Sequence, residues 1–165
     1  MNKKIAYYGL LVALAFVFSY IEFLIPINFG VPGIKLGLSN LVVIIALYLS
    51  GTVSAVCISL IRIVLVSFTF GNMAALMYSL AGGVLSLLIM IIAKKTKKLS
   101  TMGVSVLGGV FHNVGQILVA MVVLETGRLI YYLPVLIVSG LVAGVVIGIL
   151  GAQVIARLPK DSFGL

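Results

Sequence analysis

Acidic residues are scarce in this chain: its 165 residues include three, and Asp161 is the single aspartate. Enzymes that act on a diphosphate commonly hold Mg²⁺ with several carboxylates, because this ion binds carboxylate and phosphate oxygens. One aspartate cannot form such a cluster. The chain is therefore not expected to carry out prenyl transfer by itself, and we predict no catalytic residues.

Histidine and cysteine are equally rare, with His112 and Cys57 the only examples. A single histidine excludes bis-histidine haem ligation and multi-histidine metal sites within one chain. A single cysteine excludes an intrachain disulfide and the paired thiols of zinc or iron–sulfur motifs. We therefore predict no metal and no cofactor.

The sequence also lacks the Gly-x-x-x-x-Gly-Lys-Ser/Thr pattern. That loop is the usual device by which a protein cradles the phosphates of ATP before hydrolysis. If the protein moves a molecule across a membrane by ATP hydrolysis, another subunit must supply the energy.

Apolar residues dominate the composition. They make up 63% of the chain, and charged residues make up 8%, against about a quarter in ordinary soluble domains. With roughly 20 residues per membrane span, we predict an all-α integral membrane protein in which residues 1–165 form one transmembrane domain. The six helices are expected at about 5–25, 36–50, 53–70, 73–93, 101–124 and 130–156.

The formal net charge of +8 would suggest nucleic acid as the partner of a soluble protein, but here the cations flank the apolar runs. Eight of the eleven cations lie at the two ends of the chain or between the fourth and fifth predicted helices. They are Lys3, Lys4, Lys94, Lys95, Lys97, Lys98, Arg157 and Lys160. By the positive-inside rule, both termini face the cytoplasm. The expected partner is the lipid bilayer rather than nucleic acid.

The segment Asn28–Lys35 differs from the other connections because it contains Gly30, Pro32 and Gly33. These residues prevent a continuous helix. The segment is the longest candidate for a gate or lid on the outer side.

Small residues recur every four positions in the last predicted helix, at Gly140, Gly144, Gly148 and Ala152. Such a stripe lets two helix backbones approach closely. It fits packing inside the bundle or docking of a partner membrane subunit, and the sequence leaves both open. Gly9 and Ala13 form a shorter stripe in the first helix.

Polar side chains within the spans are few, and they are costly there unless they face the bundle interior or a wet cavity. Arg62 needs an anion, carbonyl groups or water around its guanidinium, and Glu22 lies at a similar depth as its expected counter-ion. The other candidate binding residues come from the second and fifth helices. They are Lys35, Asn40, His112, Asn113 and Gln116.

In the fifth helix His112 and Gln116 are four residues apart and share a face, which Asn113 borders. These polar groups and Arg62 are predicted to converge on the outer half of the bundle. Helix-to-helix hydrogen bonding and proton handling are the plainer roles for the fifth-helix group, and a solvated loop cation is the plainer role for Lys35.

At these residues the sequence resembles a family of small bacterial membrane proteins, heptaprenyl diphosphate synthase component I, also called the Gx transporter family. The matching segments cover nearly the whole chain and are specific together. They are Pro32–Asn40, Arg62, Ser79–Ser86, His112–Gln116 and Tyr132–Val135. Ser39 stands where the family pattern leads us to expect alanine, a small-for-small exchange.

That family is similar to the substrate-binding S-components of energy-coupling factor transporters. The resemblance implies six helices, cytoplasmic termini in the bacterial cytoplasmic membrane, and an outward pocket capped by the first long loop. It also implies that small residues of the first helix dock to a transmembrane coupling subunit driven by two ATPases. Gly9 and Ala13, with Ala6, are the matching positions, although Gly9 departs from the usual alanine.

The leading hypothesis is a substrate-binding membrane subunit for uptake of an anionic or amphipathic small molecule, isoprenoid- or quinone-related. A second hypothesis, from the enzyme label, is a non-catalytic membrane subunit of heptaprenyl diphosphate synthase. A third is an accessory scaffold in membrane quinone or extracellular electron transfer. Partners that co-purify with the chain distinguish the three.

Overall fold

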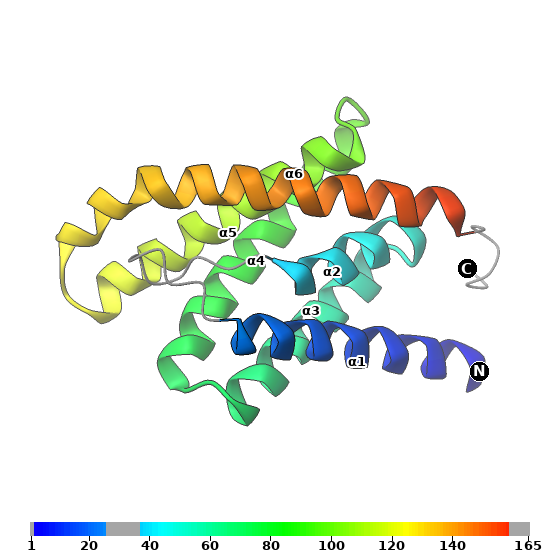
Figure 1. Ribbon diagram of the computed structural model, residues 1–165, viewed down its shortest axis with the longest axis horizontal. Helices are drawn as coiled ribbons and strands as arrows, with labels where there is room; N and C mark the ends of the chain where they lie inside the picture. The colour runs from blue at the N-terminus through cyan, green and yellow to red at the C-terminus, as the bar shows by residue number, and fades with distance from the viewer. Residues whose placement is uncertain (1, 26–36, 159–165) are drawn as a thin grey trace.

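A computed structural model of the protein describes residues 2–25 and 37–158, and the side chains from residue 5 onward in the first helix. Helices account for nearly all of these residues (Figure 1). The helices are α1 (Asn2–Leu24), α2 (Leu38–Leu49), α3 (Thr52–Thr69), α4 (Met73–Thr96), α5 (Thr101–Val123), a 3₁₀ helix η1 (Gly127–Tyr132) and α6 (Leu133–Arg157). The predicted all-α class is confirmed.

Five of these helices are long and apolar enough to cross a membrane. The exception is α2, whose 12 residues extend about 18 Å at 1.5 Å per residue, well short of a hydrocarbon core about 30 Å thick. The predicted helix 36–50 was too long, because Gly37 and Ser50, which it included, lie just outside the two ends of α2. The candidate lid at 28–35 lies outside the described residues.

Two further boundaries differ from the prediction. Helix α4 continues to Thr96, so it contains Lys94 and Lys95, which we had placed in a connection. The last predicted helix is divided, because η1 precedes α6 and Pro134 lies in the first turn of α6. Proline is well suited to that position, where its missing N–H is not needed for helix bonding.

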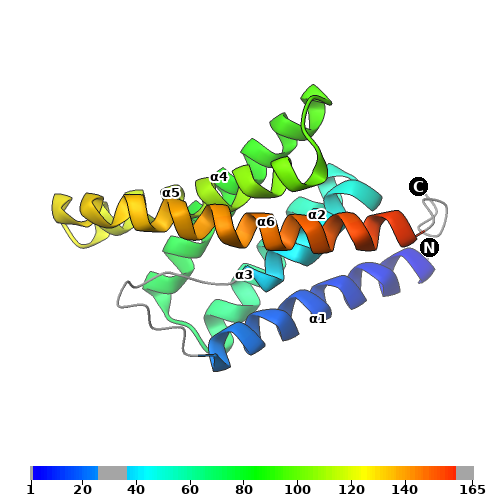
Figure 2. The same ribbon diagram turned by 45° about the horizontal axis from the view of Figure 1, so that its top comes forward.

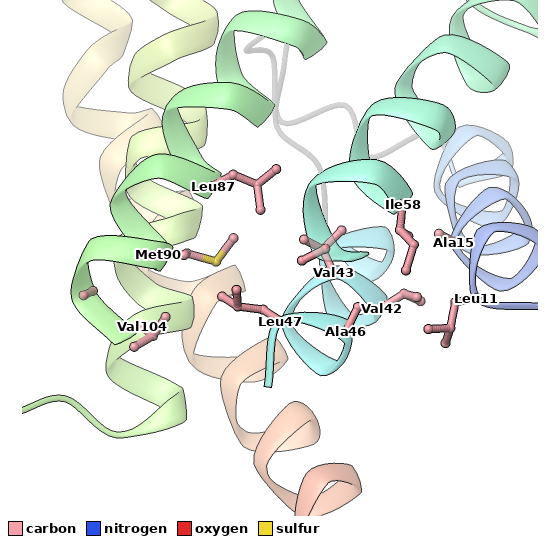
Figure 3. Packing of buried hydrophobic residues seen from close by; sticks show 12 residues of the cluster. Leu11, Ala15, Val42, Val43, Ala46, Leu47, Ile58, Leu87, Met90 and Val104 are labelled. Carbon is pink, nitrogen blue, oxygen red and sulfur yellow. The ribbon is translucent and has the colours of Figure 1, made fainter. Parts of the chain in front are cut away.

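Helix α2 lies at the centre of the bundle. Val42, Ala46 and Leu47 have no exposed surface, and Val43 and Ile44 are 1% exposed. Figure 3 shows Leu47 directed toward the α4 side of the core and Val42 and Ala46 directed toward α1. A helix buried on all sides is expected to be apolar all round, which explains its nearly unbroken run of aliphatic residues.

Lys94 of α4 binds the carboxyl end of α2. Lys94 Nζ donates a hydrogen bond to the carbonyl of Leu47 and lies 4.9 Å from the centroid of the Tyr48 ring. The carbonyls in the last turn of a helix lack partners within it, and they carry partial negative charge. Lys94 therefore satisfies one of these groups at the place where α2 ends.

Helices α4, α5 and α6 are held together by glycine. A Cβ at Gly140 would lie 2.8 Å from the Gly109 carbonyl oxygen, and a Cβ at Gly144 would lie 2.6 Å from Val106 Cα. Gly148 meets Met102 on α5 in the same way. The four-residue stripe on α6 thus packs against α5 of the same chain, so internal packing accounts for its glycines.

The outer surface carries many large apolar side chains, as expected where lipid replaces water as the solvent. Examples from four different helices are Leu10, Phe68, Val122 and Val142, each more than half exposed. Soluble monomers rarely expose apolar surface on this scale. The architecture is that of a multi-pass membrane bundle.

The helix ends divide into two groups (Figures 1 and 2). The beginning of α1, the end of α6, the α2–α3 turn and the α4–α5 connection lie toward one end of the bundle. The carboxyl end of α1, the α3–α4 turn and the α5–α6 connection lie toward the other. Lys94 and Lys95 in the last turn of α4 and Lys97 and Lys98 just after it therefore mark one end, which we call the basic end.

The glycine packing predicts a sharp contrast between two alanine substitutions. Gly140→Ala should destabilise the protein by about 1–3 kcal/mol, because the new methyl group meets backbone atoms that can move only with the helix. Gly9→Ala should have no such cost, since a Cβ there meets nothing within 4 Å. Unfolding in detergent, followed by circular dichroism, measures both. Equal stability of the two variants would contradict the packing described.

Candidate functional site

A cavity of about 350 Å³ lies at the end of the bundle opposite the basic end. The carboxyl ends of α1 and α3 and the beginnings of α2 and α4 form one part of its wall. Gly109, His112 and Asn113 of α5 and Gly140 and Ala143 of α6 form the other. All six α-helices thus contribute to the site. Its volume falls in the range of small-molecule pockets, which is about 300–1,000 Å³.

Arg62 lies in the wall of this cavity and is 9% exposed. It is held on the inward side of α3, next to Ile63 and three residues beyond Ser59, both of which are buried. Its Nη1 donates a hydrogen bond to the Ser39 hydroxyl. Its Nε is buried and has no hydrogen-bond partner within residues 2–25 and 37–158.

Glu22 approaches Arg62 from α1 but reaches it through Ser39. The Ser39 hydroxyl donates to Glu22 Oε2 at 3.3 Å, and the Leu38 backbone N–H donates to Glu22 Oε1 at 2.9 Å. The carboxylate therefore accepts a bond at the N-terminus of α2, where a negative charge is favoured. The predicted pairing of Glu22 with Arg62 takes the form of a three-residue chain across α1, α2 and α3.

The fifth-helix residues occupy two different positions. His112 and Asn113 line the cavity. Asn113 Nδ2 donates to the Leu136 carbonyl at 2.7 Å and to the Ser139 hydroxyl at 3.2 Å, so its amide nitrogen ties α5 to α6. Its side-chain carbonyl is the part of the amide that is suited to a ligand.

Gln116 lies one turn further along, half-buried against α4. A Cβ built on Gly82 would come within 2.7 Å of Gln116 Cγ and within 3.2 Å of His112 Cε1. The two side chains therefore share a face, as predicted, and contact the same glycine. The cavity wall includes His112 but not Gln116.

Asparagines from two helix beginnings complete the polar lining. Asn40 comes from the first turn of α2, and Asn72 is the N-cap of α4, where its side chain accepts a hydrogen bond from the Ala75 N–H at 2.8 Å. Lys35, the remaining predicted binding residue, lies outside the described residues. Of the six predicted binding residues, Asn40, Arg62, His112 and Asn113 line the cavity.

An aromatic cluster closes the side of the cavity between α1 and α3. The Phe70 ring lies 5.5 Å from Phe16, 5.6 Å from Tyr20 and 5.2 Å from Phe23, measured between centroids. Phe23 and Phe70 both line the cavity. Rings at these separations in tilted arrangements stabilise one another, so the cluster fixes the ends of α1 and α3 at the site.

Sequence reasoning missed two features of this site, Ser39 and Phe70. We had treated Ser39 as a small residue equivalent to alanine, whereas its buried hydroxyl joins Arg62 to Glu22. The signal available was a hydroxyl one residue before Asn40 in a segment already selected for its polar groups. Nothing in the spacing distinguished Phe70 from the other apolar residues of its helix.

The two predicted docking residues lie away from the cavity, on α1. Gly9 and Ala13 are both exposed, and so is Ala6. They form a shallow stripe on the side of α1 that faces away from the other described helices. Within the described residues, no group of three or more His, Cys, Asp or Glu side chains is placed to hold a metal ion.

The sequence matches the model of one known protein family. A family model described as heptaprenyl diphosphate synthase component I matches residues 11–154, which include every residue of the cavity wall. The chain belongs to this family. The description names a component of a synthase. The family resemblance drawn from the sequence motifs is thus confirmed, whereas likeness to S-components stays a prediction.

Two other comparisons found no match. Neither a curated protein nor a solved structure matches this member of the component I family.

The three-residue chain predicts the effect of Ser39→Ala. Removing the hydroxyl leaves a buried guanidinium group without its acceptor, which should cost about 1–3 kcal/mol of stability. Thermal unfolding in detergent measures this loss. Ser54→Ala serves as the control, because the Ser54 hydroxyl bonds to the Ser50 carbonyl one turn earlier rather than to a charged group, and it should change stability by less than about 0.5 kcal/mol. A Ser39 variant as stable as the control would show that the link contributes nothing.

Proposed function

We propose that this component I protein is the substrate-binding membrane subunit of an uptake system, similar in role to the S-components of energy-coupling factor transporters. The substrate is an anionic or amphipathic small molecule. One observation carries the proposal: a cavity with a buried arginine and several neutral polar side chains lies within a bundle that is otherwise apolar. Intramembrane charges are costly and usually serve a substrate or ion path.

The residues have distinct roles in this proposal. Arg62 binds the anionic group of the substrate by charge-assisted hydrogen bonds, with Lys35 as a second cation. Asn40, His112 and Asn113 orient its polar edges. Gln116 packs beside His112 against Gly82. Although it lies outside the described cavity wall, it remains a proposed binding residue next to His112. The apolar rings at the α1–α3 side accept the rest of the molecule.

The orientation belongs to the proposal as well. The basic end would face the cytoplasm of a bacterial cell, with both termini there, and the cavity would open outward. The support is the separation of charges: Lys94, Lys95, Lys97 and Lys98 lie at the end of the bundle opposite the cavity. This is the asymmetry that the positive-inside rule describes.

The exposed stripe on α1 would provide the contact with a transmembrane coupling subunit, which ATPases would drive. Ala6, Gly9 and Ala13 are exposed, and a Cβ at Gly9 would meet nothing within 4 Å in the described structure. Small residues allow close approach of a second helix. The α6 stripe is unavailable for this purpose because α5 already covers it.

A second candidate function follows from the family description. In it, the protein is the non-catalytic membrane subunit of heptaprenyl diphosphate synthase, and a separate chain supplies the carboxylates that hold magnesium. The observation in its favour is the family name itself. It predicts a stable complex with a soluble, aspartate-rich synthase.

Mass spectrometry of the small molecules and proteins that survive gentle detergent purification separates the two candidates. A bound small molecule together with coupling ATPases is the result expected for the uptake subunit. A synthase partner without a bound molecule would instead support the second candidate.

The role of Arg62 predicts the behaviour of Arg62→Ala. Loss of a charge-assisted hydrogen bond of about 1.5–3 kcal/mol should lower ligand affinity by about tenfold or more. The measurement is the amount of co-purified ligand per protein. Arg128→Ala, at an exposed cation in η1, is the matched control and should retain the ligand. If Arg62→Ala retains it as well, this pocket is not the binding site.

The docking stripe makes a separate prediction. Gly9→Phe should prevent close approach of the coupling subunit and reduce its co-purification, while ligand binding persists because Gly9 is remote from the cavity. Val142→Phe, at an exposed position on α6, is the control for added bulk in the lipid-facing surface. Undiminished recovery of the coupling subunit with Gly9→Phe would rule out this docking surface.

A further inference from the structure

The size of the cavity limits what it can hold. A cavity of 150 Å³ accommodates benzene, which corresponds to about 25 Å³ for each non-hydrogen atom. The 350 Å³ cavity therefore has room for about 14 such atoms by the same ratio. A heptaprenyl chain has roughly 35 carbon atoms and would need more than about 800 Å³ on this scale. The described part of the cavity is therefore too small to enclose a whole prenyl chain.

The polarity of the wall points away from a hydrocarbon ligand as well. Half of the residues around the cavity have polar side chains, in a chain that is 63% hydrophobic. Three of the serines, Ser19, Ser39 and Ser67, are themselves buried. A site for an isoprenoid tail would gain from apolar contacts throughout, whereas this lining offers hydrogen bonds from several sides.

The described part of the cavity wall presents one charge of each sign, side by side. Arg62 contributes one positive charge and Glu22 one negative charge, and a single hydroxyl oxygen lies between them. In a site of low dielectric constant, a purely anionic group on Arg62 would also lie close to the negative charge of Glu22. A ligand that carries both charges would instead pair with each group.

Both charged groups have further hydrogen-bonding positions with which to bind such a ligand. Arginine has five N–H donors, and within the described part of the chain Arg62 uses one of them, toward Ser39. A carboxylate has about four acceptor positions, and Glu22 fills two with Leu38 N–H and the Ser39 hydroxyl. Each group can therefore take a ligand bond while the three-residue chain stays intact.

We infer that the substrate is a compact zwitterion of the amino-acid class, with its carboxylate on Arg62 and its ammonium group on Glu22. In an amino acid these two groups are attached to one carbon, which suits a guanidinium and a carboxylate separated by one hydroxyl. The side chain would lie against Phe23 and Phe70 in the cavity wall. This inference rests on the proposed function and narrows its substrate class.

The test uses the full-length protein in lipid nanodiscs and isothermal titration calorimetry. The probes are the twenty proteinogenic amino acids, each added singly, and farnesyl diphosphate as an anionic isoprenoid. At least one amino acid should bind. Its carboxamide, which lacks the carboxylate, and its N-acetyl derivative, which lacks the ammonium group, should each bind at least about tenfold more weakly, as expected when one charge-assisted bond is lost.

Substitutions in the protein test the same contacts without changing the ligand. Glu22→Gln keeps the acceptor oxygen for α2 but removes the charge, so it should weaken the amino acid about tenfold or more and weaken the N-acetyl derivative little. Glu125→Gln changes an exposed carboxylate after α5 and should leave affinity unchanged. The circular dichroism spectrum of each variant shows that it has folded.

The outcomes separate this inference from the function on which it rests. Binding of farnesyl diphosphate alone, lost in Arg62→Ala, would overturn the amino-acid assignment and leave a substrate-binding subunit. Equal binding of the carboxamide or the N-acetyl derivative would also overturn the assignment. If no probe binds and a synthase co-purifies without any small molecule, both the inference and the proposed function fail.

Discussion

A buried arginine within an apolar membrane bundle is the constraint on which the rest of the site depends. The guanidinium of Arg62 cannot lose its charge, and the hydrocarbon around the protein offers it no hydrogen bonds. The Ser39 hydroxyl accepts a hydrogen bond from this guanidinium, and the same hydroxyl donates one to the carboxylate of Glu22. Three helices meet at this point, so the same interactions that accommodate the charge also fix the position of the cavity wall.

The bundle is packed differently on its two sides. Glycines bring α4, α5 and α6 into close backbone contact, and Gly82, Gly109, Gly115 and Gly140 leave no room for a side chain. On the other side α1, α2 and α3 pack around the apolar core, to which α4 adds Leu87 and Met90 (Figure 3). Tight packing on one side therefore supplies a rigid wall, against which His112 and Asn113 are held, while the other side provides the charged groups.

Much of the fold followed from the sequence because apolar runs of membrane length leave few alternatives to helices. The helix order and most boundaries were predicted, and four of the six predicted binding residues, Asn40, Arg62, His112 and Asn113, line one cavity. The shortness of α2 was not, because a central helix needs no lipid-length span when its neighbours enclose it. The continuation of α4 through Lys94 was missed for a related reason: the Leu47 carbonyl and the Tyr48 ring, which receive the lysine, come from a distant part of the chain.

The limits of sequence reasoning are clearest at Ser39 and Gln116. Serine and alanine are equivalent as small residues, and the difference appears only where α1 and α3 bring Glu22 and Arg62 to the same hydroxyl. Gln116 shares a helix face with His112, yet Gly82 of α4 lies against it. Such outcomes depend on how the helices cross, which residue spacing within one helix does not specify.

The claim at the centre of this account is that Arg62 serves a ligand. Nitrogen-15 NMR of the arginine side chains, in protein solubilised before and after removal of small molecules, tests it most directly, with Arg62→Lys providing the assignment. The account predicts that the Arg62 Nε resonance shifts when the ligand is removed and returns when the extracted small molecules are restored, while Arg128 and Arg157 stay unchanged. An Arg62 resonance that is the same in all three samples would contradict it and leave the arginine with a purely structural role.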